Sequence, residues 1–401
     1  MLKILKGNVA IMTISWVLFG IGTAITMPYY SLYIKALGGT DFHVALVISM
    51  SRLADIPLII PGGYLTDIIG RRKLIIPLTW IVAILLFIYG LAPNWQYLLI
   101  ISFIDSLLHF YRPALHAILV DSLPPKFRAR GILISTLIPN IPWLIMPPLG
   151  GWLIDRYGLL GFRLAYIIAG ITGVIAAILR TKFLVETLPA ERRIKTINKR
   201  NILSSYLDTI KVIKEVRKEV KYMIIGSMLI SGITVSTYAS YAVIFTSEII
   251  GLSKELWGWF NTIGMVIAII ISLLLIPYLD KASRRIVIVA SSLIYVLGIS
   301  SILTLNYIGV LISVILTSIA YTIYHPAWQA YIGDIVKKEL RGRINAIITI
   351  ATAFGLFWGN LFVGYIYSIN PVLTFEIGVI IGFIEVTYWA ITIREPKVRQ
   401  V

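Results

Sequence analysis

Roughly twelve apolar segments, each near the length of about 20 residues that crosses the hydrocarbon core of a bilayer, dominate this chain of 401 residues. They lie near 9–34, 43–65, 74–91, 96–120, 132–154, 161–183, 222–247, 256–278, 286–304, 307–332, 344–367 and 372–393. Only 14% of the residues are charged, which is too few to cover a soluble globule of this length. The sequence therefore predicts an all-α, polytopic membrane protein with twelve transmembrane helices.

The connections between these segments alternate in positive charge. The cation-rich connections lie at 3–6, 71–73, 126–130, 185–221, 281–285, 337–343 and 394–399, whereas the others contain only Lys35, Arg156, Arg163 and Lys254. By the positive-inside rule the cation-rich set is cytoplasmic, so we expect a multi-pass protein of the cell membrane with both termini in the cytoplasm. The same distribution accounts for the net charge of +17. Because the cations are spread over alternate turns, no nucleic-acid partner is expected.

An internal repeat relates the two halves of the chain. A shift of 213 residues brings YRPALHAILVDSLPPKFRAR (111–130) onto YHPAWQAYIGDIVKKELRGR (324–343). The same shift superimposes the charged residues of 67–72 on those of 280–285. A register that is kept at separate places is not a chance match. We therefore predict two pseudo-symmetric six-helix bundles, at 1–184 and 222–401, joined by a cytoplasmic linker at 185–221.

The segment GGYLTDIIGRRK (62–73) contains a Gly-x-x-x-Asp-x-x-Gly-Arg-Arg-Lys pattern. It resembles the signature of the loop between the second and third helices of the major facilitator superfamily, and PPLGGWL (147–153) and FLVETLP (183–189) are similar to other segments of that family. The resemblance covers the whole chain and implies a secondary transporter with a cytoplasmic gate. In that gate Asp67 would face the start of the eleventh helix, and Arg71 would meet Asp121. The gate and its repeated copy comprise Gly63, Asp67, Gly70, Arg71, Arg72, Asp121, Asp280, Arg284, Arg285 and Asp334.

Ionisable residues interrupt the fourth apolar segment at helical spacing. They share one face of the helix and are Asp105, His109, Arg112 and His116. The repeat places a second polar stripe on the tenth segment, at Ser318, Thr322, His325 and Gln329. Charged groups inside a bilayer normally face the bundle interior or a water-filled cavity, so we expect both stripes to face the axis between the halves. Pro113 and Pro326 are predicted to kink both helices.

These stripes supply the candidate site residues. Asp105 is the first candidate for proton coupling and Glu385, which has no obvious partner in its own helix, is the second; Asp55 and His109 complete the set. A carboxyl in an apolar cavity favours its neutral form and an adjacent cation favours the ionised form, so motion of the halves can change protonation. Aromatic side chains beside polar groups suit an amphiphilic or cationic solute. The predicted substrate-binding residues are Arg112, His116, Tyr111, His325, Tyr324, Trp328, Gln329 and Tyr321.

These features favour a secondary active transporter that works by alternating access, with proton-coupled export of a small amphiphilic or drug-like solute as the leading hypothesis. An importer or exchanger of a polar nutrient such as a sugar or organic anion is the first alternative, and a membrane sensor without net flux is the second. The chain contains no G-x-x-x-x-G-K-[ST], G-x-S-x-G or H-E-x-x-H motif, so we expect neither an enzyme nor a cofactor. His109 and His116 lack a third ligand for a metal. The expected partners are a small-molecule substrate, protons and the lipid bilayer, with the protein itself a monomer.

Overall fold

The computed structural model describes residues 5–124, 127–189, 216–279 and 282–395, together with 206, 209 and 211–213. Within these residues the structure is helical and contains no strand. In the first half, the helices are α1 (Gly7–Thr26), η1 (Met27–Tyr29), α2 (Tyr30–Ala36), α3 (Asp41–Ile69), α4 (Arg71–Gly90), α5 (Trp95–Leu108), η2 (His109–Tyr111), α6 (Arg112–Asp121), α7 (Arg128–Leu137), η4 (Ile138–Leu144), α8 (Met146–Tyr157) and α9 (Leu159–Phe183).

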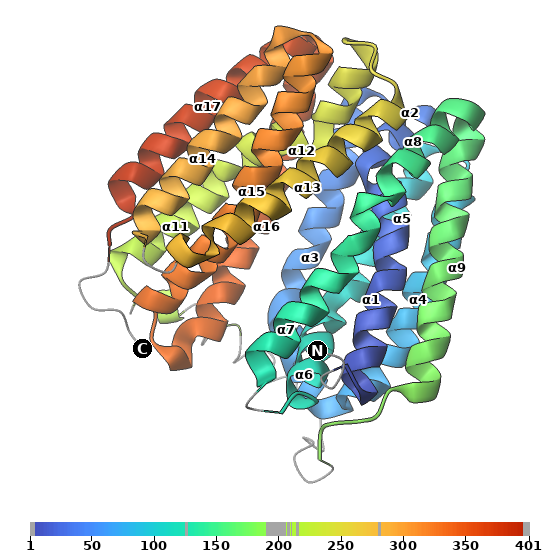
Figure 1. Cartoon of the computed structure of the whole chain (residues 1–401), viewed down its shortest axis with the longest axis vertical. Coiled ribbons are helices and arrows are strands. Elements are labelled where there is room, and N and C mark those ends of the chain that lie inside the picture. The colour runs from blue at the N-terminus through green and yellow to red at the C-terminus, as the bar shows by residue number, and fades with distance from the viewer. Residues whose placement is uncertain are drawn as a thin grey trace.

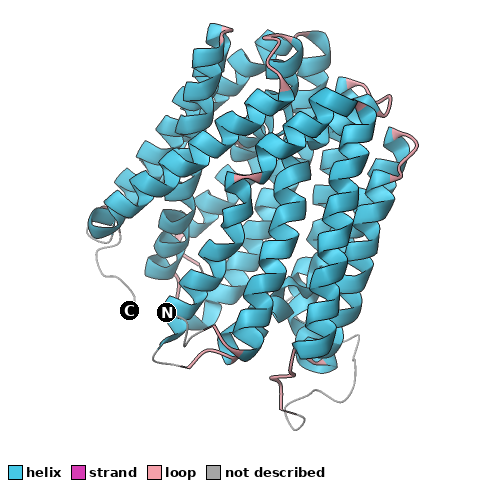
Figure 2. Ribbon diagram, turned by 45° about the vertical axis from the view of Figure 1, so that its right-hand side comes forward, coloured by secondary structure: helices cyan, strands magenta, loops and turns pink. Residues whose placement is uncertain are grey.

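The second half repeats this order. Its helices are α11 (Lys218–Leu229), α12 (Ser231–Glu248), α13 (Lys254–Leu279), α14 (Arg284–Ser301), η6 (Ile302–Thr304), α15 (Tyr307–Ile335), η7 (Lys338–Leu340), α16 (Arg341–Ile369) and α17 (Pro371–Thr392). Eleven helical spans among the described residues are long and apolar enough to cross a membrane, and the bent pair α11 and α12 forms the twelfth. The predicted all-α fold of two six-helix bundles is confirmed (Figures 1 and 2).

The boundary between the second and third spans differs from the expected loop. α3 continues to Ile69, and α4 begins at Arg71. Gly70, with φ of +90°, is the single residue between them. Because a residue with a Cβ adopts such a φ only at a cost, glycine suits this sharp change of direction. The motif that begins at Gly63 therefore starts inside a helix instead of in a loop.

Both chain termini lie at one end of the molecule, which we call the terminal end; the opposite end is the far end (Figure 1). The two halves approach each other at the far end and diverge toward the terminal end (Figure 1). Between the halves, α3 contacts α16 and α8 contacts α13. These two pairs are equivalent by the repeat, since α3 corresponds to α13 and α8 to α16. α9 ends at Phe183 and α11 begins at Lys218, and most of the linker between them lies outside the described residues, so the limits at 184 and 222 stay a prediction.

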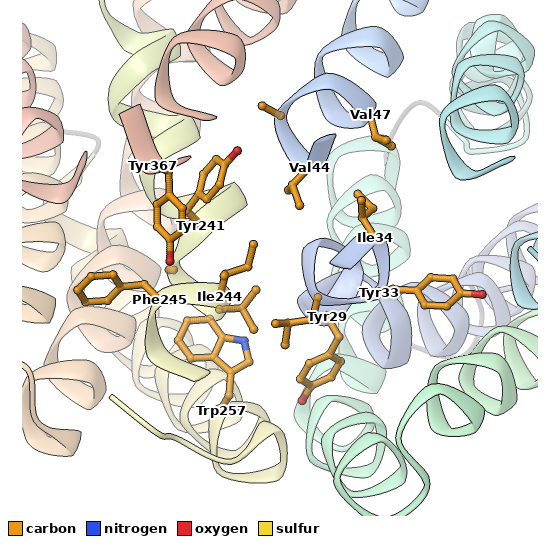
Figure 3. Packing of buried hydrophobic residues seen from close by; sticks show 14 of the residues in the cluster. Tyr29, Tyr33, Ile34, Val44, Val47, Tyr241, Ile244, Phe245, Trp257 and Tyr367 are labelled. Carbon is orange, nitrogen blue, oxygen red and sulfur yellow. The ribbon is translucent and has the colours of Figure 1, made fainter. Parts of the chain in front are cut away.

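A continuous apolar core crosses the seam at the far end. It includes Tyr29, Ile34 and Val44 from the first half and Tyr241 and Trp257 from the second half, all buried. In Figure 3, Tyr29 and Val44 lie beside the seam on one side and Tyr241 and Trp257 on the other, with Ile34 deeper in the first half. Burial of apolar surface stabilises by roughly 25 cal/mol per Å² where water would otherwise enter. The far end is therefore closed by packed side chains, and among the described residues the core shared by both bundles lies there.

Within the second half, α12 and α16 touch through glycines. A Cβ added at Gly232 would collide with the backbone of Gly355, and one added at Gly359 would collide with the backbone of Gly232. Without a side chain at these positions, the two helix backbones come into direct contact. Small residues commonly permit this close approach between helices in membranes.

We predict that Gly232→Val destabilises the protein, because neither backbone can move away without disturbing its own bundle. Overpacking of this kind costs about 1–3 kcal/mol. Gly333→Ala is the matched control, since a Cβ there meets nothing within 4 Å. Thermal unfolding of the two variants in detergent measures the difference. A Gly232→Val protein as stable as Gly333→Ala would contradict the direct helix contact.

Candidate functional site

The fourth transmembrane span is broken in its middle. α5 ends at Leu108, η2 covers His109–Tyr111, and α6 begins at Arg112. Pro113 has no amide proton to donate to the carbonyl of His109, so the helix is interrupted where that hydrogen bond would lie. The equivalent Pro326 lies inside α15, which is continuous from Tyr307 to Ile335. The expected effect of the two prolines therefore appears as a break in the first half only.

The break places an acid and a base in contact. His109 Nδ1 lies 2.7 Å from the backbone oxygen of Asp105 and 3.6 Å from its Oδ1. Because a carbonyl oxygen only accepts, the closer contact requires the proton on Nδ1. In the neutral imidazole Nε2 is then an acceptor that can take a further proton. Asp105 and His109 together can hold or pass one proton.

A second acid and base approach from α3. Arg52 Nη1 lies 4.0 Å from Asp55 Oδ2, which is a loose ion pair within one helix. Asp55 also interacts electrostatically with Arg112 and His109, and Asp105 interacts with both of these and with Asp55. The two carboxyls, two guanidiniums and one imidazole thus form a single group, which we call the seam cluster: Arg52, Asp55, Asp105, His109 and Arg112.

Two tyrosines that the sequence did not point to border the seam cluster. Tyr89, from α4, lies close enough to Asp105 to interact with its carboxyl. The ring of Tyr30 lies edge-on to Tyr89, with centroids 6.2 Å apart. Both residues lie near the ends of apolar segments, where tyrosine is common at the membrane interface, so no local pattern marks them as site residues.

The second half contributes an uncharged face to the seam. Tyr321, His325 and Gln329 follow one another at intervals of four residues on α15, and all three are exposed. Tyr321 is close enough to Arg52 to interact with it electrostatically, so this face of α15 is directed toward the seam cluster. The rings of Tyr321 and His325 lie 6.1 Å apart. Of the stripe expected on the tenth helix, His325 and Gln329 lie on this face, whereas Ser318 and Thr322 are half-buried.

Two of the aromatic residues predicted to bind substrate lie elsewhere. Trp328 is buried within the second half, where its ring contacts Tyr324 at 5.4 Å and Trp389 at 5.1 Å between centroids. Tyr324 and Trp328 pack toward α17 and do not join the seam cluster.

Tyr111 is also buried inside its own half, with 4% of its surface exposed. It interacts with Arg180, a fully buried arginine of α9 that the sequence analysis missed. Arg180 donates through Nε to Ser15 Oγ and through Nη1 to Thr79 Oγ1, at 2.9 Å each, and its guanidinium lies over the ring of Phe19. Hydroxyl groups from α1 and α4 thereby satisfy the cation. Because Arg180 lies close to the end of an apolar segment, its sequence position is that of an ordinary charged residue at the membrane interface.

His116 is exposed on α6, one turn beyond Arg112. Glu385, by contrast, is 8% exposed inside the second half. Its carboxylate accepts from Ser231 Oγ at 2.6 Å and from Trp389 Nε1 at 3.1 Å. Trp389 is four residues further along α17, so the expectation that Glu385 has no partner in its own helix is wrong. It is a satisfied buried acid at a distance from the seam cluster.

At the terminal end, each half contains one ion pair of the predicted gate. Arg71 pairs with Asp121, and Arg284 Nε lies 3.3 Å from Asp334 Oδ2. Both pairs join residues of the same half. The side chain of Asp67 and the whole of Asp280 lie outside the described part of the chain, as does the surface at Gly63. The proposed contact of Asp67 with the other half therefore stays a prediction.

Two further acids organise this end and were not predicted. Glu186 accepts from the backbone amides of Arg71 and Arg72 at 3.3 and 3.1 Å, at the first turn of α4. Glu395 accepts from the amides of Arg284 and Arg285 at 3.3 Å each, at the first turn of α14. A carboxylate stabilises a helix N-terminus because it satisfies free amides and opposes the positive end of the dipole. A glutamate thus caps the N-terminus of the third span in each repeat.

The sequence profile of the Major Facilitator Superfamily matches residues 12–254 and 224–401 of this chain. The chain belongs to the major facilitator superfamily. It is therefore a secondary transporter of the membrane, as its resemblance implied. Within the superfamily, an uncharacterized MFS-type transporter of Methanocaldococcus jannaschii is 22% identical over 95% of this chain and 94% of its own length. The quinolone resistance protein NorA of Staphylococcus aureus is 20% identical over 87% of both chains.

Solved structures of major facilitator transporters share the fold. The nucleoside transporter NupG superimposes with a TM-score of 0.73 at 15% identity, covering 96% of this chain and 99% of its own. A bacterial homolog of the human lysosomal transporter Spinster, in an inward-facing and unoccupied conformation, gives 0.73 at 15% identity, covering 96% of both chains. At these identities the likeness concerns the arrangement of the helices alone.

We predict that Glu186→Gln lowers the stability of this transporter, because the charge at the first turn of α4 is lost while the volume is kept. A carboxylate at a helix N-terminus contributes about 0.3–2 kcal/mol. Glu376→Gln removes an exposed acid elsewhere and serves as control. The measurement is the thermal unfolding midpoint in detergent. Equal midpoints for the two variants would refute the capping role.

Proposed function

We propose that this transporter exports a small amphiphilic or drug-like solute in exchange for protons, by alternating access across the seam between its halves. The terminal end is the cytoplasmic end in this proposal, because the cation-rich connections gather there. The structure is then inward-facing, with the seam closed on the outer side of the membrane. This is the state in which an exporter would collect its solute.

The observation that carries the proposal is the seam cluster. Its two carboxyls and one imidazole are the side chains that exchange protons, and its two guanidiniums can favour either state of the carboxyls as they approach or withdraw. The cluster lies on α3 and on both sides of the break in the fourth span. Rocking of the halves changes its surroundings, because Tyr321 of the other half is one of its neighbours. Protonation and movement are thus coupled at Asp105.

The solute class is argued from the walls of the seam. Tyr321 is 68% exposed on one side, and the half-buried Tyr30, which packs on the buried Tyr89, borders the cluster on the other. Aromatic faces beside carboxyls suit organic cations and amphiphiles. The likeness to a quinolone resistance protein over most of the chain supports the same class.

An importer of a polar nutrient is the second candidate. His325 and Gln329 are exposed on the second half, and Arg112 is exposed on the first. Together they offer hydrogen-bond donors that could hold a sugar or an organic anion. In that case Arg112 contacts the solute instead of adjusting the charge of Asp105.

Proteoliposomes that contain a pH-sensitive dye distinguish these functions. We expect added ethidium, an amphiphilic cation, to release protons across the membrane, and D-xylose to release none. We expect Asp105→Asn to lose proton-driven accumulation while exchange of ethidium for labelled ethidium persists, because the solute site remains and the titrating group does not. Glu385→Gln should keep proton-driven accumulation, since that acid is satisfied inside its own half.

Proton-driven accumulation at the unaltered rate in Asp105→Asn would refute the coupling role. Proton movement with D-xylose and none with ethidium would favour the nutrient importer. If neither solute moves protons or exchanges, the export proposal fails.

A further inference from the structure

The contact between the halves at the far end has an ionic centre that the superfamily resemblance does not specify. Lys35 Nζ of the first half lies 2.7 Å from Glu248 Oε2 of the second half and 2.6 Å from Asp41 Oδ1 of its own half. Positions 35 and 248 are separated by 213 residues, the repeat distance. Equivalent residues of a pseudo-two-fold pair can meet only close to the axis. Opposite charges at these positions make the meeting attractive, where identical residues would repel.

Two tyrosine hydroxyls contact the other half around this pair. Tyr241 donates to the carbonyl oxygen of Asp41 at 2.8 Å. The hydroxyl of Tyr29 lies 2.6 Å from the carbonyl oxygen of Pro147 in its own half and 3.0 Å from that of Lys254 across the seam. Asp41 and Lys254 are the first residues of α3 and α13, and they too are 213 residues apart. Each half therefore holds the beginning of the equivalent helix in the other half. We call Lys35, Glu248, Tyr29, Lys254, Tyr241 and Asp41 the far-end clasp.

The helices beside the far-end clasp fit closely, again in equivalent pairs. A Cβ at Gly151 would collide with the carbonyl of Lys254, and a Cβ at Gly364 would collide with Ala45. Gly151 and Gly364 are also related by the repeat. Both helix crossings depend on glycine, so a small separation of the halves breaks many contacts at once. The interface therefore has two states, closed and open, and does not open gradually.

We propose that the far-end clasp is the outer gate of the transport cycle and that Lys35 is its principal positioning residue. The ion pair is accessible enough to separate, since the side chain of Glu248 is 42% exposed and that of Lys35 is 20% exposed. Water can then replace each partner as the halves part. The hydroxyl of Tyr241 likewise exchanges a carbonyl for water, and that of Tyr29 keeps the carbonyl of Pro147, so neither hydroxyl loses its partner on opening.

Accessibility of a reporter cysteine tests this gate without any substrate. The chain contains no cysteine, so Val44→Cys introduces the only thiol. Val44 is fully buried at the seam, close to the far-end clasp (Figure 3). A membrane-impermeant maleimide is added to the far side of the membrane. The rate of labelling then reports how often the seam opens there.

In the Val44→Cys protein, we expect Lys35→Gln and Glu248→Gln each to raise the labelling rate by about twofold to fivefold, the change that a partly exposed ion pair supports. The double variant should label no faster than Lys35→Gln alone, because both substitutions remove the same interaction between the halves. Arg156→Gln, which removes one positive charge at the same end, should leave the rate unchanged. Thermal unfolding of each variant confirms that it is folded.

Unchanged labelling in Lys35→Gln, or additive effects in the double variant, would overturn the proposal. Neither outcome depends on which solute is carried or on proton coupling, so a failure of the gate and a failure of the export proposal are separate results.

Discussion

Hydrocarbon offers no hydrogen-bond partner, and this constraint explains how the structure places the ionisable side chains of its membrane-spanning helices. Arg180 and Glu385 meet it inside one bundle each, the arginine with hydroxyl groups of Ser15 and Thr79 and the acid with Ser231 and Trp389. The seam cluster meets it differently, through loose ion pairs beside a surface that separates. Arg180 and Glu385 have partners within their bundles, whereas Arg52 Nε and Asp105 Oδ1, which have no hydrogen-bond partner among the described residues, lie at the seam between the bundles.

The two halves share their architecture but differ in the polar residues that face the seam. Both repeats have a glutamate at the first turn of the third span, an arginine–aspartate pair at the terminal end and a glycine crossing at the far end. The first half, however, has the acids and bases of the fourth span, while the second half has Tyr321, His325 and Gln329 on the tenth. With the carboxyls and guanidiniums in one wall, the charge of that wall can change without rebuilding the other wall.

The spans, the repeat and the polar stripes could be predicted because each depends on periodicity along the chain. Hydropathy marks helices, and a spacing of three or four residues marks a helix face. Periodicity does not say which helix lies opposite, so Tyr324 and Trp328 were assigned to the seam although they pack on Trp389. Arg180, Glu186 and Glu395 were missed for a related reason: each acts on a helix distant in sequence, at a position where a charge is ordinary. Pro113 accounts for the break at His109–Tyr111, but the equivalent Pro326 lies in a continuous helix, so a proline alone does not determine whether the helix breaks.

The joint at Gly70 has a mechanical consequence. With a single residue between α3 and α4, no slack chain separates the second span from the third, and Glu186 ties the beginning of α4 to the end of α9. Tilt of the span that carries Arg52 and Asp55 is therefore transmitted directly to its neighbour and on to the last span of the bundle. In the proposed cycle, a change of charge at these two residues would act on the terminal end of the bundle through a stiff linkage, without a flexible loop between the helices.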